Sequence, residues 1–222
     1  MRLYAVKTPR ILPLLQPKGL IWKAGAALPQ DALYLTFDDG PHPKVTPQVL
    51  DLLRQYKAKA TFFCVGENAA RFPQLVARIL AEGHTIGNHT HNHLNGWKTP
   101  TRTYVGNALA AAGNLATGWF RPPYGRIRAA QAHYLQKHGF RVVMWDVLSC
   151  DFDPQYGARD CARFVIRHAR PGSIVVFHDS PKAAARCMPA LEMVLRYYSR
   201  RGWPLPAFPE FSRPNTALHD FD

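Results

Sequence analysis

Short, almost wholly apolar runs alternate with amphipathic helical stretches along most of this chain. The runs at 59–65 and 173–177 are apolar at nearly every position, as expected for parallel strands that helices cover on both faces. Repeated strand–helix units of this kind predict a parallel sheet with right-handed crossovers, which is an α/β fold. The predicted strands are 33–37, 59–65, 84–87, 118–121, 140–145 and 173–177, with a weaker one near 205–208.

Helical patterns fill the intervals between these runs. Thr46 and Pro47 are typical of an N-cap followed by a first-turn proline, and they open a helix that reaches Tyr56. The predicted helices are 46–56, 73–82, 100–117, 128–138, 158–169 and 187–201. Six or seven strand–helix units either close into an irregular barrel or stay an open doubly wound sheet. No GxGxxG or GxxxxGK[ST] pattern follows a strand, which disfavours the nucleotide-binding form of such a sheet.

Length and charge limit the classes of protein that remain. A chain of 222 residues has room for one full domain, and no apolar stretch approaches the ~18 residues of a membrane span. Residues 1–20 hold no apolar block followed by a small-residue cleavage site, so an export signal is not visible and the compartment stays open. The net charge of +13 favours anionic partners, but no Lys/Arg run resembles a nucleic-acid-binding arm, so we expect no nucleic-acid partner.

The cysteines carry little functional signal. Cys64, Cys150, Cys161 and Cys187 form no CxxC pair, which leaves a zinc ribbon without support. Cys64 lies within an apolar run and is expected to pack as a small hydrophobic residue. A disulfide between Cys150 and Cys161, or between Cys161 and Cys187, stays open, whereas free thiols would fit a reducing compartment.

Two adjacent carboxylates, Asp38 and Asp39, end the first predicted strand just before Gly40-Pro41. Neighbouring carboxylates repel each other and add nothing to a core, so at least one of them needs a cation or a chemical task. Asp-Asp-Gly also occurs in ordinary turns. A divalent metal ion is the simplest partner for such a pair.

Reactive residue types follow the other predicted strands as well. In barrel enzymes the chemistry lies where parallel strands end and the following loops begin, so we expect these side chains to gather at one end of the sheet. They are Asp38 and Asp39; His89, His91 and His93; Arg121; Asp146, Asp151 and Asp153; and His178 and Asp179.

The histidine cluster after the third strand predicts metal binding. If the segment is a helical turn, His89 and His93 share a face; if it is extended, His91 joins them. Two imidazoles with the Asp39 carboxylate make three protein ligands and leave positions for water and substrate, the pattern of a catalytic metal site. A metal acidifies bound water and polarises a carbonyl, and Asp38 would then take the water proton as general base.

Four motifs occur in order along the chain: Thr36-Phe37-Asp38-Asp39-Gly40, His89-Thr90-His91-Asn92-His93, Arg121-Pro122-Pro123-Tyr124-Gly125 and Val176-Phe177-His178. Together they resemble the successive motifs of the polysaccharide deacetylases, the NodB-homology or carbohydrate esterase family 4 group. The similar region runs from about Leu33 to Arg201. The resemblance implies a distorted (β/α)7 barrel of parallel strands, similar to a TIM barrel, and metal-dependent removal of N- or O-acetyl groups from sugars.

The resemblance also assigns the metal ligands and the base. Asp39, His89 and His93 would hold one divalent ion, with Zn²⁺ expected ahead of Co²⁺, Fe²⁺, Mn²⁺ or Ni²⁺. Asp38 would be the base, and Arg121 would pair with it through charge-assisted hydrogen bonds.

The same resemblance assigns roles to three further residues. The backbone N–H of Tyr124 would help the metal to stabilise the oxyanion, while its phenol ring fits plain packing equally well. His178 would be the general acid that protonates the departing amine, and Asp151 would hold its imidazole and raise its pKa. Asp179 is expected only to cap a helix or to form a turn.

Residues 145–152 match the family's fourth motif imperfectly. Phe152 follows Asp151 where the family usually has Trp, so Phe152 is expected to form an apolar wall for the acetyl methyl group. Asp146 and Asp153 stay alternatives to Asp151. Among the tryptophans, Trp97, Trp119 and Trp145 are candidates for stacking on sugar rings, although Trp119 and Trp145 adjoin strands and fit the core or a pocket wall better.

Together these features predict a catalytic NodB-like domain at 31–210, an N-terminal extension at 1–30 packed on the barrel, and a tail at 211–222. We expect a monomeric, metal-dependent deacetylase of N-acetylated carbohydrate, such as peptidoglycan, a chitin-like polymer or N-acetylglucosamine oligosaccharides. One alternative is an enzyme of the same fold that cleaves a small non-sugar amide or an O-acetyl ester such as acetylxylan. Another is a carbohydrate-binding protein with a degenerate site, against which the intact set of reactive residues argues.

Overall fold

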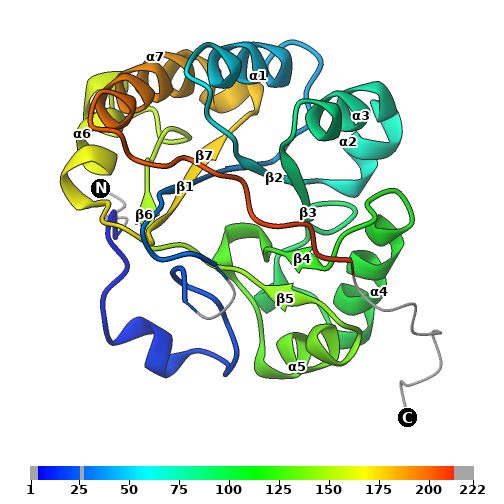
Figure 1. The fold of residues 1–222 in the computed structure, drawn as a ribbon. Coiled ribbons are helices and arrows are strands. Elements are labelled where there is room, and N and C mark those ends of the chain that lie inside the picture. The colour runs from blue at the N-terminus through cyan, green and yellow to red at the C-terminus, as the bar shows by residue number, and fades with distance from the viewer. Residues whose placement is uncertain (1–4, 26–27, 213–222) are drawn as a thin grey trace.

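Seven parallel strands form one sheet in the order β5-β4-β3-β2-β1-β7-β6 (Figure 1). The computed structural model describes residues 5–25 and 28–212. The sheet curls, and helices surround it, so the structure confirms the α/β class and the distorted barrel predicted from the sequence. The strands are β1 (Tyr34–Asp38), β2 (Thr61–Cys64), β3 (Thr85–Asn88), β4 (Trp119–Phe120), β5 (Arg141–Val142), β6 (Val147–Leu148) and β7 (Ile174–His178).

The helices follow the predicted pattern with local differences. They are α1 (Thr46–Gln55), α2 (Gly66–Arg71), α3 (Pro73–Ala81), α4 (Thr101–Ala112), α5 (Ala129–Lys137), α6 (Ala158–His168) and α7 (Pro181–Ser199), with short 3₁₀ turns η1 (Leu12–Leu15), η2 (Gly96–Lys98) and η3 (Pro123–Gly125). The helix α2 was not predicted, because its six residues are too few to show a periodic pattern. The start of α7 was predicted too late, since the internal Pro189 obscures a helix that begins at Pro181.

The prediction of a weak strand near 205–208 is wrong. Residues 204–211 run across the amino ends of the strands instead of along one partner (Figure 1). The N–H of Leu33 donates to the Pro204 carbonyl at 3.0 Å, and that of Lys59 donates to the Leu205 carbonyl at 2.7 Å. Pro204, Pro206 and Pro209 have no N–H to donate, so the segment cannot form a continuous ladder and closes one end of the barrel instead.

The N-terminal segment lies at the seam between the edge strands β5 and β6 (Figure 1). Ile21 bridges to Val143 in parallel, and Lys7 bridges to Val147 in antiparallel orientation. Both edge strands are two residues long, and β6 was not predicted for that reason. Backbone groups at the two open edges therefore find partners in this segment.

Alternation along β1 decides which side chains reach the interior of the barrel. Leu33, Leu35 and Phe37 belong to the cluster that packs under the helices, where Phe37 stacks on Phe62 with 5.0 Å between ring centroids. Because successive side chains point to opposite faces, Thr36 and Asp38 lie on the inner face, and both are buried. The last residue of this strand thus presents a carboxylate to the barrel interior.

Two further predictions concern the described part of the chain. The four cysteines all lie within it, all are buried, and none forms a disulfide. Among the helices of residues 5–25 and 28–212, none combines the length and apolarity that a membrane crossing requires.

Candidate active site

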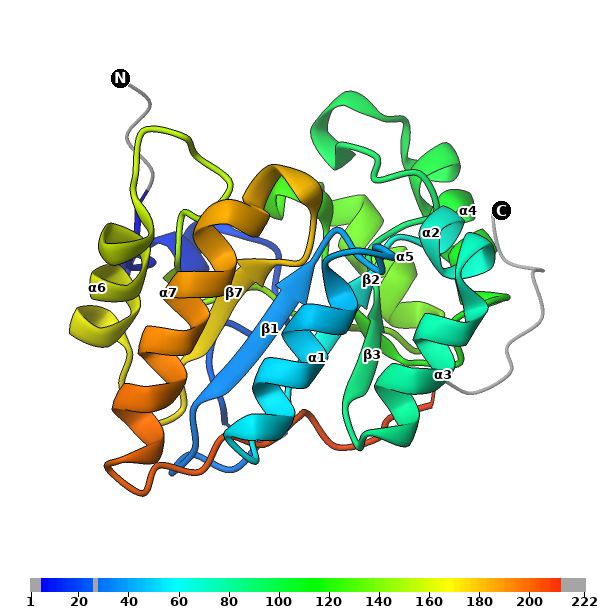
Figure 2. The ribbon, with the colours of Figure 1, turned by 90° about the horizontal axis from the view of Figure 1, so that it is seen from above.

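Most of the predicted reactive residues lie at the carboxyl ends of the strands, which are at the top of the barrel in Figure 2. Asp38 and His178 are the last residues of β1 and β7 and are directly paired in the register of these strands. His89 follows β3, and Arg121 follows β4. The parallel register therefore brings side chains that lie far apart in the sequence to one place.

Asp39, His89 and His93 form a group in which the possible ligand atoms lie within 4.8 Å of one another. The Asp39 Oδ1 atom is 3.1 Å from His93 Nε2 and 3.9 Å from His89 Nε2. His91 is not in the group; its backbone N–H donates to Asn107 Oδ1 at 2.8 Å. The segment is neither the helical turn nor the extended run considered from the sequence, because positive φ angles at Thr90 and His93 bend it tightly.

The protonation of the group fits a divalent metal ion. The Arg121 carbonyl lies 2.8 Å from His89 Nδ1, which places the ring proton on Nδ1 and leaves the Nε2 lone pair for a metal. Burial lowers the pKa of His89 to about 4, so its imidazole is neutral. Burial opposes ionisation of Asp39, but the hydrogen bond from His93 and the positive charge of His178 outweigh it and lower the pKa of this carboxyl below its usual range.

A fully buried guanidinium fixes the Asp38 carboxylate. Arg121 Nη1 donates to Asp38 Oδ1 and to Thr36 Oγ1, both at 2.7 Å, and Nη2 donates to the Met144 carbonyl at 3.0 Å. The ring of Phe63 lies against the same guanidinium, 4.0 Å from centroid to Cζ. A buried Arg needs a counter-charge, and Asp38 supplies it. The carboxylate is therefore held in one orientation beside the Asp39 group.

His178 is held by Asp151, which is fully buried. Asp151 Oδ1 lies 2.7 Å from His178 Nδ1, and Oδ2 accepts the backbone N–H of His178 at 2.8 Å. Burial lowers the pKa of His178, but the Asp151 carboxylate, with smaller contributions from Asp39 and Asp38, more than offsets this effect and raises the pKa to about 9. The two alternatives lie elsewhere: Asp146 pairs with Lys7, and Asp153 accepts the backbone N–H of Gln155.

Phe152 and the side chain of Tyr124 also border the site. The Phe152 ring contacts the His178 ring edge-on, with 5.0 Å between centroids. Tyr124 has φ 61°, and its hydroxyl lies 3.2 Å from His93 Nδ1. An Nδ1–H that donates to this hydroxyl leaves His93 Nε2 free for a metal. Sequence reasoning weighed the Tyr124 ring only as packing and missed this contact, for which no local pattern exists.

Asp179 was expected only to cap or form a turn, yet it ties two loops of the site together. Its Oδ1 accepts the Gly40 N–H at 3.0 Å, and its Oδ2 accepts the Thr46 hydroxyl at 2.5 Å. The prediction that Thr46 caps α1 is wrong: Thr46 is the first residue of the helix, and its hydroxyl is bound to Asp179 instead. A Cβ on Gly40 would lie 2.1 Å from the Asp179 carboxylate, so glycine is required there. Burial raises the pKa of Asp179 to about 7.

Comparison with known proteins identifies the family. The sequence profile of the family described as "Polysaccharide deacetylase" matches residues 25–143. A peptidoglycan-N-acetylglucosamine deacetylase of Bacillus cereus is 35% identical over 210 residues, which cover 90% of this chain and 96% of that protein. A chitooligosaccharide deacetylase of Azorhizobium caulinodans is 33% identical over 199 residues, which cover 81% of this chain and 94% of that protein.

Solved structures agree with this assignment. The crystal structure of a peptidoglycan N-acetylglucosamine deacetylase in complex with 4-naphthalen-1-yl-N-oxidanyl-benzamide superposes with a TM-score of 0.77 at 31% identity. The superposition covers 90% of this chain and 95% of that structure. The chain therefore belongs to the polysaccharide deacetylase family.

Proposed function

We propose that this protein is a metal-dependent deacetylase that hydrolyses the acetamido group of N-acetylated sugars in a glycan. One observation carries the proposal: the buried Arg121–Asp38 pair lies beside the Asp39, His89 and His93 group, and His178 is the partner of Asp38 on the adjacent strand. The names of the relatives support the substrate class, since they act on peptidoglycan N-acetylglucosamine and on chitooligosaccharides.

Asp39, His89 and His93 would hold one divalent metal ion. A carboxylate with two imidazoles suits Zn²⁺ first and also accepts Co²⁺, Fe²⁺, Mn²⁺ or Ni²⁺. When bound, the ion supplies Lewis acidity that makes a water easier to deprotonate and polarises the acetyl carbonyl. The protein supplies the orientation of the groups around it.

Asp38 then acts as general base on the attacking water. Arg121 holds the carboxylate through a charge-assisted hydrogen bond, so Asp38 keeps one oxygen directed at Arg121 and the other is left to accept the water proton. Tyr124, whose hydroxyl contacts His93, would donate its backbone N–H to the developing oxyanion.

His178 acts as general acid on the departing amine. Its Nδ1–H donates to Asp151, so the proton that it gives away is the one on Nε2. With a pKa of about 9, the imidazole is protonated at neutral pH. The C–N bond breaks as the amine nitrogen takes this proton, and the products are acetate and the free amino sugar.

An acetate-release panel tests the proposal. The protein, loaded with Zn²⁺, is given N-acetylglucosamine oligomers, peptidoglycan, acetylxylan and small N-acetyl amides. We expect acetate from the N-acetylated glycans, and we expect Asp38→Asn or removal of the metal with a chelator to abolish it. Release confined to acetylxylan or small amides would assign the chain to an esterase or amidase. Full activity after both treatments would refute the mechanism, and glycan binding without release would indicate a binding protein.

A further inference from the structure

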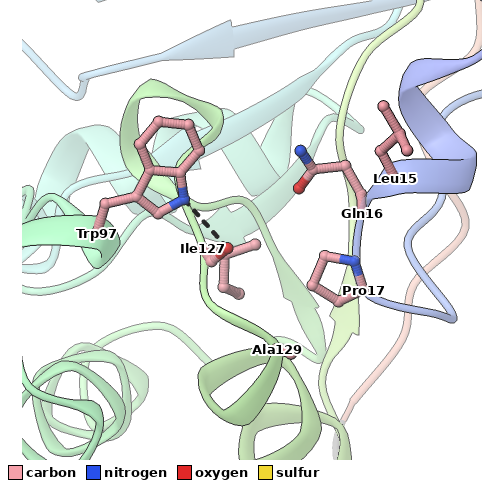
Figure 3. A pocket seen from close by; sticks show the side chains of 6 residues that line it. All are labelled: Leu15, Gln16, Pro17, Trp97, Ile127 and Ala129. Atoms are coloured by element: carbon pink, nitrogen blue, oxygen red, sulfur yellow. Dashed lines mark hydrogen bonds between the residues drawn. The ribbon is translucent and has the colours of Figure 1, made fainter.

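A groove of about 410 Å³ lies between the N-terminal segment and the loops that follow β3 and β4 (Figure 3). Its lining comes from three separate parts of the chain: Leu15, Gln16 and Pro17; Trp97; and Ile127 and Ala129. The volume is in the range of sites that hold small molecules. None of the proposed catalytic groups lines this groove, so its purpose is a separate question.

Trp97 presents a fixed aromatic surface on one side of the groove. The indole N–H donates to the Ile127 carbonyl at 3.3 Å, and the Arg126 guanidinium lies over the ring, 5.1 Å from its centroid. Arg128 also donates to the backbone carbonyl of Trp97. The residue nevertheless stays 51% exposed. Leu15 on the opposite side of the groove is also exposed, so the two residues belong to one exposed apolar surface of the kind that binding sites have.

The groove adjoins the proposed active site. Trp97 lies four residues after His93, so their Cα atoms are at most about 15 Å apart. On the other side Ile127 lies three residues after Tyr124, whose hydroxyl contacts His93 and whose surface is 60% exposed. An extended ligand can therefore reach from the Asp39 group past Tyr124 to Trp97.

The opposite wall belongs to the N-terminal segment and is anchored to the barrel. The Gln16 carboxamide faces Trp97 across the groove (Figure 3). Gln136 of α5 donates to the Lys18 carbonyl at 3.1 Å, and Ile21 is bonded into the seam beside β5. These contacts on either side of Gly19 hold the wall in position, so the fold itself fixes the shape of the groove.

We propose that this groove holds a further sugar of the glycan chain, outside the acetylated sugar that reacts. The apolar face of the pyranose would stack on Trp97, and the Gln16 amide would both donate to and accept from sugar hydroxyls. Arg126 and Arg128 place positive charge at the same rim, which favours glycans that carry carboxylates. The inference rests on the proposed function and adds a preference for long over short oligomers.

The test compares Trp97→Ala with wild type on the N-acetylglucosamine hexamer and dimer. For the hexamer we expect KM to rise about tenfold with kcat unchanged, because one stacking contact is lost. For the dimer, which is too short to occupy both places, kcat/KM should stay the same. Trp97→Phe should restore most of the hexamer affinity. Leu14→Ala is the matched control, since Leu14 is 82% exposed in the same segment but does not line the groove.

Calorimetry with the Asp38→Asn variant separates this inference from the proposed function. We expect this variant to bind the hexamer without cleaving it, and to bind it about tenfold more weakly once Trp97→Ala is added. Equal losses on dimer and hexamer, or unchanged hexamer binding in the double variant, would overturn the groove proposal. Absence of acetate release by wild type from every glycan would overturn the proposed function alone, because the binding measurement does not depend on turnover.

Discussion

The pairing of His178 with Asp151 predicts a pH-dependent part of the stability of the metal-free protein. The pKa of His178 rises from 6.5 to about 9 in the folded state. This difference of roughly 2.5 units corresponds to ~3 kcal/mol at 1.36 kcal/mol per unit. The His178 side chain is only 13% exposed, and that of Asp151 is fully buried, so solvent screening removes little of this energy.

The raised pKa of His178 determines whether stability is gained or lost as the pH rises. Because the folded-state pKa is raised, the stabilisation is complete below the unfolded value near 6.5 and is lost as the pH rises through about 9. Urea unfolding of wild type and His178→Gln, both in a chelator, isolates this contribution at each pH. The stability advantage of wild type should shrink by ~3 kcal/mol between pH 6 and pH 10.

A second variant separates the ion pair from other effects of the histidine. In Asp151→Asn the burial of His178 remains and the strongest of the opposing interactions is gone, while Asp39 and Asp38 still raise the pKa; the pKa of His178 should therefore fall well below its wild-type value of about 9. An NMR titration of the imidazole protons measures this pKa directly. If the advantage of wild type over His178→Gln were the same at pH 6 and pH 10, or if the titration of His178 were unchanged in Asp151→Asn, the reasoning would be refuted.

Two other substitutions test the supports of the site. Arg121→Met leaves the buried Asp38 carboxylate without its counter-charge and should lower the free energy of unfolding by about 3–5 kcal/mol at pH 7, as measured by urea denaturation; a loss under 1 kcal/mol would contradict the pairing. Tyr124→Phe removes the hydroxyl beside His93 Nδ1 and should weaken Zn²⁺ binding about tenfold in a chelator competition, with unfolding stability unchanged. Wild-type affinity in this variant would mean that the hydroxyl does not orient the ligand.

Features that depend on local pattern could be predicted from the sequence. The apolar runs of β1, β2 and β7 are long enough to identify a buried parallel sheet, and the residues directly after the strands lead to the site. The grouping of Asp39 with His89 and His93 follows from the same logic, because parallel strands end at one edge.

Features that depend on distant contacts could not be predicted. The strand β6 has two residues and exists because β7 and the N-terminal segment flank it. The bend that selects His93 over His91 needs positive φ at non-glycine residues, which no side-chain pattern indicates. Likewise, Asp179 accepts a hydrogen bond from the Gly40 N–H because the two residues follow neighbouring strands. Only the register of β7 with β1 creates this contact.

The seam filled by the N-terminal segment has a consequence for the order of folding. Lys7 contacts Asp146, 139 residues further along the chain, so a ribosome must make most of the barrel before this segment has anything to bind. Contacts of such sequence separation cost loop-closure entropy early and form late. Residues of the N-terminal segment are therefore synthesised long before their partners and are among the last to reach their final positions. One wall of the groove beside Trp97 would be completed only when the barrel has already formed.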